Sequence, residues 1–459
     1  MVDVDYTPHS QEEIQEMLDF IGIKSLSSLF DTIPKELLLD QASIQETSKS
    51  SFLNRKGLTE IGLYRHLKSI GKQNKIYKAV FQGAGCYNHY IPAIVDFIAS
   101  RSEFWTAYTP YQAEISQGFL QVIFEYQSLI ANLTGMNYSN ASLHDGATAL
   151  ADAITMAKSQ HRKRNTIVII GEMNPLYKET LDTSFLARDY KFKQVKVEDI
   201  RSSIDEEVMA VVINSPDFLG TVHDVKQIVN LVKNIDKKII LIQSITEILS
   251  LALLSPPGEN GVDIAVGEAQ SLGIPMQFGG PLLGFIAVNS VKLLHKIPGR
   301  IVGVTKEERG DNYGFTLTLQ AREQHIRRER ALSNICSNEA LNMLRAVVYM
   351  VALGRTGLKN LAKINVRKAG YLKTKLLKMN DVRVINEINT FNEFTIQLNP
   401  LKIKGILKRC EEENILGPLD LGMFDDEWNG NLLICVTEMC EIESLDLLIK
   451  IITEEVAKT

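Results

Sequence analysis

The sequence predicts an α/β protein in which an open, largely parallel sheet is followed by a small α+β domain. Between residues 120 and 290, short β-branched apolar runs alternate with helical stretches. Runs that are apolar at every position are typical of strands buried on both faces, and their alternation with helices indicates parallel βαβ units. The 459-residue chain is long enough for three units: an N-terminal helical arm (1–75), a large α/β domain (76–335), and a connecting helix with a small C-terminal domain (336–459).

The arm is predicted to begin with an amphipathic helix. Ser10 and Glu13 have the spacing of a capping box, in which each side chain satisfies a backbone N–H group at the start of a helix. Apolar residues then recur at the helical period: Ile14, Met17, Leu18 and Ile21. Such an arm buries its apolar stripe either on its own body or on a partner.

The large domain is predicted to contain buried strands at 166–170, 209–213, 238–242 and 262–266, and a further apolar strand at 284–288. Open α/β sheets bind ligands beyond the carboxyl ends of their strands. The loops that directly follow these runs are therefore where chemistry is expected.

The last unit is predicted to start with a long helical stretch around 338–353. The pattern then indicates, in order, a helix at 358–378, strands at 382–384 and 394–398, a helix at 403–413, a strand at 432–436 and a helix at 442–456. This order is typical of a small α+β domain.

Composition excludes several classes of protein. The chain has 50 Lys and Arg against 55 Asp and Glu, a net charge of −5, and no basic block interleaved with aromatic residues, so nucleic acid is not an expected partner. Five scattered cysteines suggest reduced thiols in a cytoplasmic protein and lack the pattern of a zinc site. The acidic N-terminus does not have the pattern of a secretory signal, and the longest apolar stretch, 239–254, contains Gln243 and Glu247, so no membrane segment is expected.

Residues 140–152 place small and polar side chains before a helix-forming run. Free N–H groups at such a helix start, near Ser142, Asp145 and Thr148, could bind an anion such as a cofactor phosphate. Plain N-capping by Asp145 and Gly146 is the alternative, and it is the more frequent use of such residues.

The loop at 214–220 resembles a turn of pyridoxal-phosphate enzymes with the aspartate-aminotransferase fold. In that fold the next strand ends in an Asp, which keeps the pyridine nitrogen of the cofactor protonated and so makes the ring an electron sink. Here that strand carries Gln243 at the expected position. A neutral amide cannot hold the pyridinium proton electrostatically.

The cofactor lysine of such enzymes is also missing. Schiff-base formation requires an amine, yet no lysine lies between Asp263 and Lys292. Judged from Pro275 and the turn at 279–281, Gln270 most nearly occupies the position of the lysine. The pair His295 and Lys296 superficially resembles a cofactor site, but it lies some two dozen residues later in a helical-looking stretch, where a solvated helix charge is expected.

Two further stretches are rich in Tyr, Gln, His and Arg. They cover 83–92 with 106–118, and 320–330 with 333–338. Clustered side chains of these types could line a polar pocket or a subunit interface. The alternatives are a surface loop for the first stretch and an ion-paired Arg/Glu helix face for the second.

These stretches together resemble one family. The strings are GAGCYNHYIP, EFWTAYTPYQAEISQG, GMNYSNASLHDGATALADA, GEAQSLGIPMQFGGPLLGF, PGRIVG and LQAREQHIRRERALSNICSNEALN. They are similar to the alpha subunits of glycine dehydrogenase (decarboxylating), the split form of the glycine cleavage system P-protein. The resemblance runs nearly from end to end of the chain.

The resemblance implies a large domain of the fold-type-I pyridoxal-phosphate-dependent transferase class (aspartate-aminotransferase-like), with a small C-terminal α+β domain. It implies an alpha2beta2 tetramer in which the beta subunit carries the lysine and the pyridoxal phosphate, while this chain has no catalytic residue of its own. The assembly would decarboxylate glycine and pass the aminomethyl group to the lipoyl arm of H-protein. Residues expected to face the beta subunit's site or the lipoyl channel are His89, Tyr108, Thr109, Tyr111, Gln112, Gln324 and His325.

Two other functions compete with this interpretation. One is an autonomous pyridoxal-phosphate lyase or aminotransferase that uses an unrecognised lysine such as Lys296. The other is a non-catalytic scaffold or regulator that retains only the fold. The missing amine between Asp263 and Lys292 argues against the first, and the polar strings at 108–112 and 322–330 favour an enzyme subunit over the second.

Overall fold

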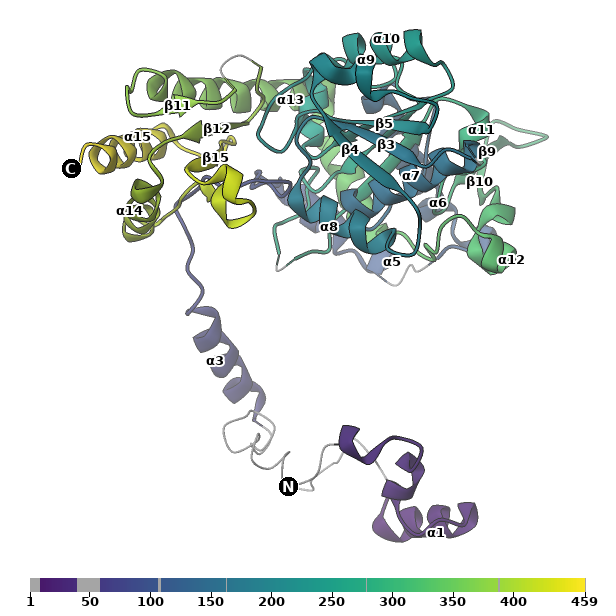
Figure 1. Cartoon of the computed structure of the whole chain (residues 1–459). Coiled ribbons are helices and arrows are strands. Elements are labelled where there is room, and N and C mark those ends of the chain that lie inside the picture. The colour runs from purple at the N-terminus through teal and green to yellow at the C-terminus, as the bar shows by residue number, and fades with distance from the viewer. Residues whose placement is uncertain are drawn as a thin grey trace. The chain divides into compact units, whose positions relative to one another are not determined.

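The computed structural model describes residues 9–38, 58–105, 109–161, 163–277, 279–386 and 389–458. The chain divides into two compact units, Met1–Ile76 and Tyr77–Thr459. Figure 1 shows the helices of the first unit and the two larger sheets of the second.

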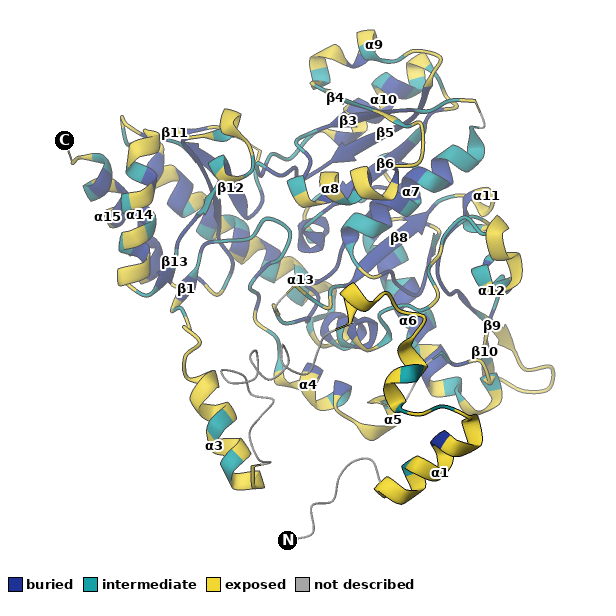
Figure 2. Cartoon of the chain, turned by 60° about the horizontal axis from the view of Figure 1, so that its bottom comes forward, coloured by how far each residue is buried: buried dark blue, intermediate teal, exposed yellow. Residues whose placement is uncertain are grey.

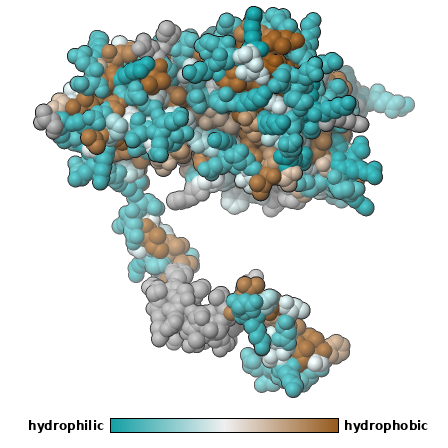
Figure 3. Space-filling model, viewed as in Figure 1, coloured by the Kyte–Doolittle hydropathy of each residue, from teal (hydrophilic) through white to brown (hydrophobic). Residues whose placement is uncertain are grey.

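The described residues of the first unit form the helices α1 (Gln11–Ile21) and α3 (Glu60–Gly71) and two short 3-10 helices (Leu26–Phe30 and Lys35–Leu37). The predicted capping box is present: Ser10 N donates to Glu13 Oε2 at 2.7 Å, and Glu13 N donates to Ser10 Oγ at 3.2 Å. Apolar side chains gather on part of the surface of α3 in the view of Figure 3. Ile61, Tyr64 and Leu67 are among those exposed there.

A seven-stranded sheet forms the centre of the second unit, in the order β2-β8-β7-β6-β5-β3-β4. The five strands from β7 to β4 are parallel, whereas β8 and β2 are antiparallel to their neighbours. The bounds are β2 Tyr138–Ser139, β3 Thr166–Ile170, β4 Lys191–Val195, β5 Val208–Asn214, β6 Ile240–Ile245, β7 Ile264–Glu268 and β8 Gly284–Val288. The predicted parallel core is confirmed.

Apolar side chains cover both faces of this sheet. In β3, Ile167 and Ile169 belong to one hydrophobic cluster, together with residues of α7 (Gly146–Gln160) and α8 (Pro175–Ser184). Val168 belongs to the other cluster, together with residues of α6 (Gln117–Thr134) and α10 (Val225–Ile235). Figure 2 shows the strands buried between these helices. Burial on both faces explains why the sequence of β3 is apolar without alternation.

Among the strands of five residues or more, three had no such sequence signal. The edge strand β4 alternates lysine with other residues and is partly exposed. Strands β9 (Val302–Lys306) and β10 (Tyr313–Leu317) form a separate antiparallel pair that is also largely exposed. A strand that leaves one face in water does not need the continuous apolar run by which the others were recognised.

The long helix α13 (Ala340–Leu376) leads from the large sheet to the C-terminal part. It is interrupted at Gly354, where φ is 61° and ψ is 177°. Glycine adopts this positive φ without the steric cost that a Cβ atom brings. The interruption separates the two helices predicted around 338–353 and 358–378.

A four-stranded antiparallel sheet forms the C-terminal part, in the order β11-β12-β15-β14. The strands and helices of this part are β11 Arg383–Val384, β12 Glu393–Gln397, α14 Pro400–Glu412, β14 Leu419–Asp420, β15 Asn431–Cys435 and α15 Ile442–Val456. The short strand β1 (Ala79–Val80) pairs in parallel with β13 (Ile415–Leu416), and Phe81 lies in the core of this part. Residues 79–81 therefore belong to the C-terminal part, although they precede the large sheet in sequence.

The helices of the described residues include none that is long and apolar enough to cross a membrane.

Candidate functional site

The loops after the parallel strands meet at the carboxyl edge of the large sheet, where the sequence predicts chemistry. Gln243 lies in β6 and is in register with Ile213 of β5 and Ala265 of β7. Gln270 follows β7 by two residues. Both side chains are 2% exposed.

Gln270 is tied to the backbone of the GAGCYNHYIP segment. Its Oε1 accepts from Tyr87 N at 2.8 Å, and its Nε2 donates to Tyr87 O at 3.1 Å and to Ile274 O at 2.6 Å. Both ends of the amide are therefore used within the chain. A side chain with one acceptor and one two-hydrogen donor suits a backbone N–H and two carbonyl oxygens, which an ammonium group could not match.

Gln243 has weaker contacts. Its Nε2 donates to Ser215 O at 3.4 Å, and its Oε1 has no hydrogen-bond partner among the described residues. The side chain carries no charge, so this position offers a buried amide that cannot hold a cation as a carboxylate would.

The start of α7 is closed by two carboxylates of the chain itself. Asp145 caps the helix, since its Oδ1 accepts from Thr148 N at 2.8 Å. Glu268 Oε2 accepts from Gly146 N at 3.0 Å, and its Oε1 accepts from Gln270 N and Leu283 N. Of the two alternatives for this segment, the structure therefore shows N-capping.

The Glu268 carboxyl is buried, and this burial raises its pKa to about 7. The hydrogen bonds donated by Leu283 N and Gly146 N lower the pKa, but by less than burial raises it. A negative or hydrogen-bonded carboxyl at this place competes with any anion for the N–H groups of the helix start.

The segment 83–92 crosses between the two sheets and is not the surface loop that was one alternative for it. Tyr87 is buried, and its hydroxyl donates to Glu393 Oε2 at 2.7 Å. Ala84 N donates to Glu393 Oε1 at 2.7 Å. Glu393 belongs to β12, so one carboxyl of the small sheet holds both ends of this turn. Burial raises the pKa of Glu393 to about 7, although Ala84 and Tyr87 donate to it.

His89 lies between two carboxylates. Its Nε2 is 3.1 Å from Glu247 Oε2, and its Nδ1 is 2.8 Å from Glu438 Oε2. Glu247 follows β6, whereas Glu438 follows β15, so the imidazole links the large and small sheets. Burial disfavours the charged ring, but the hydrogen bonds that the ring donates to both carboxylates, together with their negative charges, outweigh burial and raise its pKa to about 9. His89 is therefore a buried imidazolium with both nitrogens engaged.

Tyr111 and His325, which are distant in sequence, meet at one buried ion pair. Arg300 Nη1 pairs with Glu323 Oε2, and both side chains are almost completely buried. Arg300 Nη2 donates to Tyr111 Oη at 2.9 Å, and the guanidinium lies over the Tyr111 ring with 5.3 Å to its centroid. His325 Nδ1 is 3.9 Å from Glu323 Oε2. Tyr111 and His325 remain exposed to solvent. We call these four residues the Arg300 cluster.

The other predicted wall residues are less constrained. Thr109 accepts a backbone hydrogen bond from Tyr111 at 2.9 Å. Gln112 is exposed and Gln324 is half-buried. Tyr108 lies outside the described residues.

The ion-paired helix face that was the alternative for 320–330 is wrong. This stretch forms three short turns of helix, at Gln320–Arg322, Gln324–Arg327 and Arg328–Arg330. Glu323 and Arg322 point inward, and Glu323 pairs with Arg300 outside the stretch. Lys296 does not lie in a helix either, because α11 ends at Leu294 and His295 is its cap.

Several charged residues of this region could not be selected from the sequence. Glu268 is the last residue of the buried strand β7, and a charged residue at the end of an apolar run is a usable signal. Glu247, Glu393 and Glu438 have no such pattern, and only the packing of the two sheets brings them against His89 and Tyr87. Among the described residues, no group of three or more His, Cys, Asp or Glu side chains could hold a metal ion.

Comparison with known proteins gives one consistent family. The family model of the glycine cleavage system P-protein matches residues 4–452. A protein of Shouchella clausii, described as a probable glycine dehydrogenase (decarboxylating) subunit 1, is 43% identical over 451 residues, covering 96% of this chain and 97% of the relative.

Solved structures agree in fold. A crystal structure of glycine decarboxylase (P-protein) of the glycine cleavage system, in inhibitor-bound form, matches with a TM-score of 0.81 and 37% identity, covering 98% of this chain and 100% of that one. A glutamate decarboxylase of Lactobacillus brevis matches with a TM-score of 0.66 at 12% identity, covering 89% of this chain and 94% of that one. The second likeness concerns the fold alone, and the fold is that of the fold-type-I pyridoxal-phosphate enzymes.

Proposed function

The chain belongs to the glycine cleavage system P-protein family, and from this premise we propose that it is the alpha subunit of a split glycine dehydrogenase (decarboxylating). With a beta subunit it decarboxylates glycine, releases CO2 and transfers the aminomethyl group to the lipoyl arm of H-protein. The observation that carries this proposal is the match to a glycine decarboxylase over 98% of the chain, at a TM-score of 0.81 and 37% identity.

The residues of this chain do not fit a covalently bound pyridoxal phosphate. The amide of Gln270 is consumed by backbone groups of Tyr87 and Ile274. Gln243 supplies no charge for the ring nitrogen. The N–H groups of Gly146 and Thr148, at the start of α7, already bind carboxylates of the chain. These features support a cofactor carried by the beta subunit.

In this proposal the chain supplies one wall of its partner's active site. The exposed groups of the Arg300 cluster, Tyr111 and His325, are held in place by a buried ion pair and are suited to present a hydroxyl and an imidazole to a neighbouring surface. Buried, hydrogen-bonded supports fix the geometry of such groups better than loops alone. We place Thr109, Gln112 and Gln324 on the same wall because they lie within two residues of these two side chains in sequence.

His89 has a different part in the same proposal. Both of its ring nitrogens face carboxylates, and the residue is 8% exposed. It therefore acts as a positioning residue that fixes the segment 83–92 between the two sheets and does not touch substrate. The assembly is expected to be an alpha2beta2 tetramer in the cytoplasm.

The proposal is tested by separating the two subunits. The purified chain is incubated with pyridoxal phosphate, reduced with borohydride and examined by mass spectrometry. The expected result is no adduct on any lysine. The chain is then mixed with a beta-type partner, and exchange of labelled bicarbonate into glycine is measured, with each chain alone as the control.

Activity that needs both chains supports the subunit assignment. A reduced adduct on this chain, for example on Lys296, would favour the autonomous enzyme. Full exchange activity of the partner alone would favour the alternative that this chain is a non-catalytic scaffold or regulator.

A further inference from the structure

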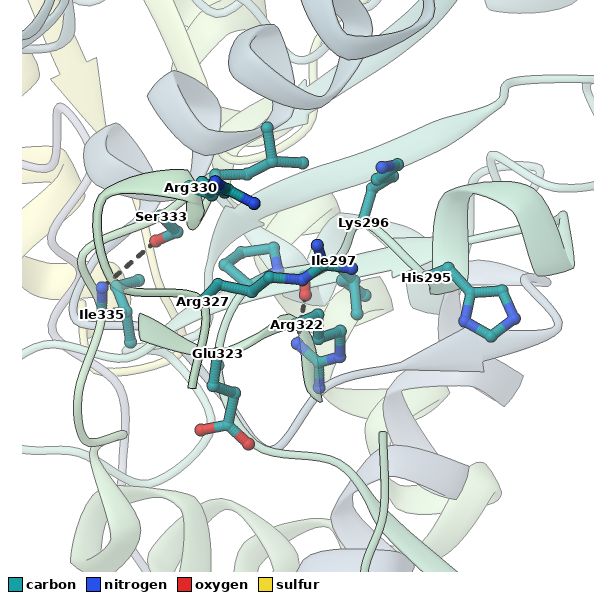
Figure 4. A pocket seen from close by; sticks show the side chains of 12 residues that line it. His295, Lys296, Ile297, Arg322, Glu323, Arg327, Arg330, Ser333 and Ile335 are labelled. Atoms are coloured by element: carbon teal, nitrogen blue, oxygen red, sulfur yellow. Dashed lines mark hydrogen bonds between the residues drawn. The ribbon is translucent and has the colours of Figure 1, made fainter. Parts of the chain in front are cut away.

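A small pocket adjoins the Arg300 cluster, because Glu323 of that cluster is one of its lining residues. Its volume is about 140 Å³, which is the space of a few water molecules or of one small ion. Five cationic or ionisable basic residues line it: His295, Lys296, Arg322, Arg327 and Arg330. Figure 4 shows the guanidinium of Arg327 extending between Arg330 and Arg322, while the His295 ring points away.

The side chains that line this pocket carry more positive than negative charge. Glu323 also lines it, but its carboxylate is engaged by Arg300. Arg327 Nε donates to the Ala321 carbonyl at 3.1 Å, and Arg330 Nε is 3.7 Å from exposed Glu329. No carboxylate of the described residues lies within ion-pair distance of Lys296.

Arg322 gives the pocket its strongest feature. Its Nη1 donates to the Ile297 carbonyl, but its Nε and Nη2 atoms are buried and have no hydrogen-bond partner among the described residues. Burial and the neighbouring Arg300 lower the pKa of Arg322 to about 10, so the group stays charged at neutral pH. Unpaired donors of a buried guanidinium cost free energy unless a ligand satisfies them.

We propose that this pocket is a binding site for a phosphate-class oxyanion, held by Arg322, Arg327, Arg330 and Lys296. Arginine forks match the paired oxygens of phosphate and make charge-assisted hydrogen bonds to them. Several cations and a volume suited to one tetrahedral ion favour a dianion over a single carboxylate. The site does not depend on the cofactor chemistry of the proposed enzyme. Neither Gln243 nor Gln270 lines it.

The test titrates inorganic phosphate into the purified full-length chain at constant ionic strength and pH, and follows the width of the phosphorus NMR signal. The expected result is saturable binding of one ion with a dissociation constant on the order of 1 mM or below. Arg327→Gln is expected to weaken binding about tenfold, the effect of losing one charge-assisted hydrogen bond. Its side chain is exposed, so the fold should survive.

Arg309→Gln is the matched control, because Arg309 is an exposed arginine in the β9–β10 connection outside the pocket. Lys296→Gln is a second variant on the opposite wall, and circular dichroism checks that each variant is folded. Acetate replaces phosphate in a parallel titration.

Unchanged binding in Arg309→Gln together with weak binding in Arg327→Gln and Lys296→Gln supports the site. Equal losses in all three variants would mean that only net charge matters, and this would overturn it. The absence of saturation, or acetate binding as tightly as phosphate, would also overturn the proposal.

Discussion

The hydroxyl of Tyr111 accepts a hydrogen bond from Nη2 of Arg300 at 2.9 Å, although 189 residues separate the two in sequence. The contact joins the loop before α6 to the loop before β9, two segments that the sequence motifs had flagged separately. It places an exposed phenol on a buried guanidinium, and Glu323 holds that guanidinium from the other side.

Tyr111→Phe is expected to reduce glycine–bicarbonate exchange by the assembled enzyme about fivefold, because one hydrogen bond of roughly 1 kcal/mol that orients the ring is lost. Stability of the isolated chain should hardly change, since Tyr111 is 57% exposed. Tyr313→Phe, at another exposed tyrosine, is the control. Equal rates for the two variants would show that Tyr111 is not part of the wall.

Glu323→Gln is expected to lower the free energy of unfolding by about 3–5 kcal/mol, because it leaves the buried Arg300 charge without its partner. Glu329→Gln removes the same charge from an exposed position nearby and should change stability by less than about 0.5 kcal/mol. Denaturant melts of the two variants measure the difference. A loss below about 1 kcal/mol for Glu323→Gln would contradict the buried pair.

Gln270→Ala is expected to cost about 2–4 kcal/mol, since Tyr87 N–H and two carbonyl oxygens lose their partner in a buried place. Gln112→Ala, at an exposed glutamine, serves as the control in the same urea melts. If the two variants melt alike, the amide does not hold the 83–92 segment.

His89 predicts a pH dependence of stability. Its pKa is raised from 6.5 to about 9 in the folded chain, so its contribution is complete below pH 6.5 and is lost as the pH rises through 9. The free energy of unfolding should therefore fall between these two pH values, by at most about 3 kcal/mol from this group. In His89→Gln this contribution is lost, so the fall should be smaller, although the variant is less stable throughout. The fall that remains comes from buried carboxyls whose pKa is raised to about 7, such as Glu268 and Glu393. A slope equal to that of the unchanged chain would assign the effect to other groups.

Gly83→Ala tests the tight passage between the sheets. A Cβ atom at Gly83 would lie 2.4 Å from Glu393 Oε1 and 2.9 Å from Cys435 Cβ, so a loss of about 1–3 kcal/mol is expected. Gly370→Ala meets nothing within 4 Å on an exposed part of α13 and should stabilise by about 0.5–1 kcal/mol. Melting curves of the two variants measure the difference. If both substitutions stabilised the chain, Gly83 would not lie as close to Glu393 and Cys435 as described.

The sequence by itself determined most of the fold. The strand at 166–170 and the helix at 442–456 have the bounds that their patterns predicted, because apolar runs and helical periodicity report directly which faces must be buried. The absence of an amine between Asp263 and Lys292 was also readable, since it depends only on residue type.

Only the tertiary structure decided which polar residues meet. Glu393 lies in the small sheet and Glu438 follows its strand β15, and no local pattern marks either residue. A charged side chain can be buried only where a partner offsets the free-energy cost of removing it from water, and that partner can lie anywhere in the chain. This is why the sequence could predict only that Gln270 stands near the position of the lysine of related enzymes, while its contacts with the backbone of Tyr87 depended on how the two sheets pack.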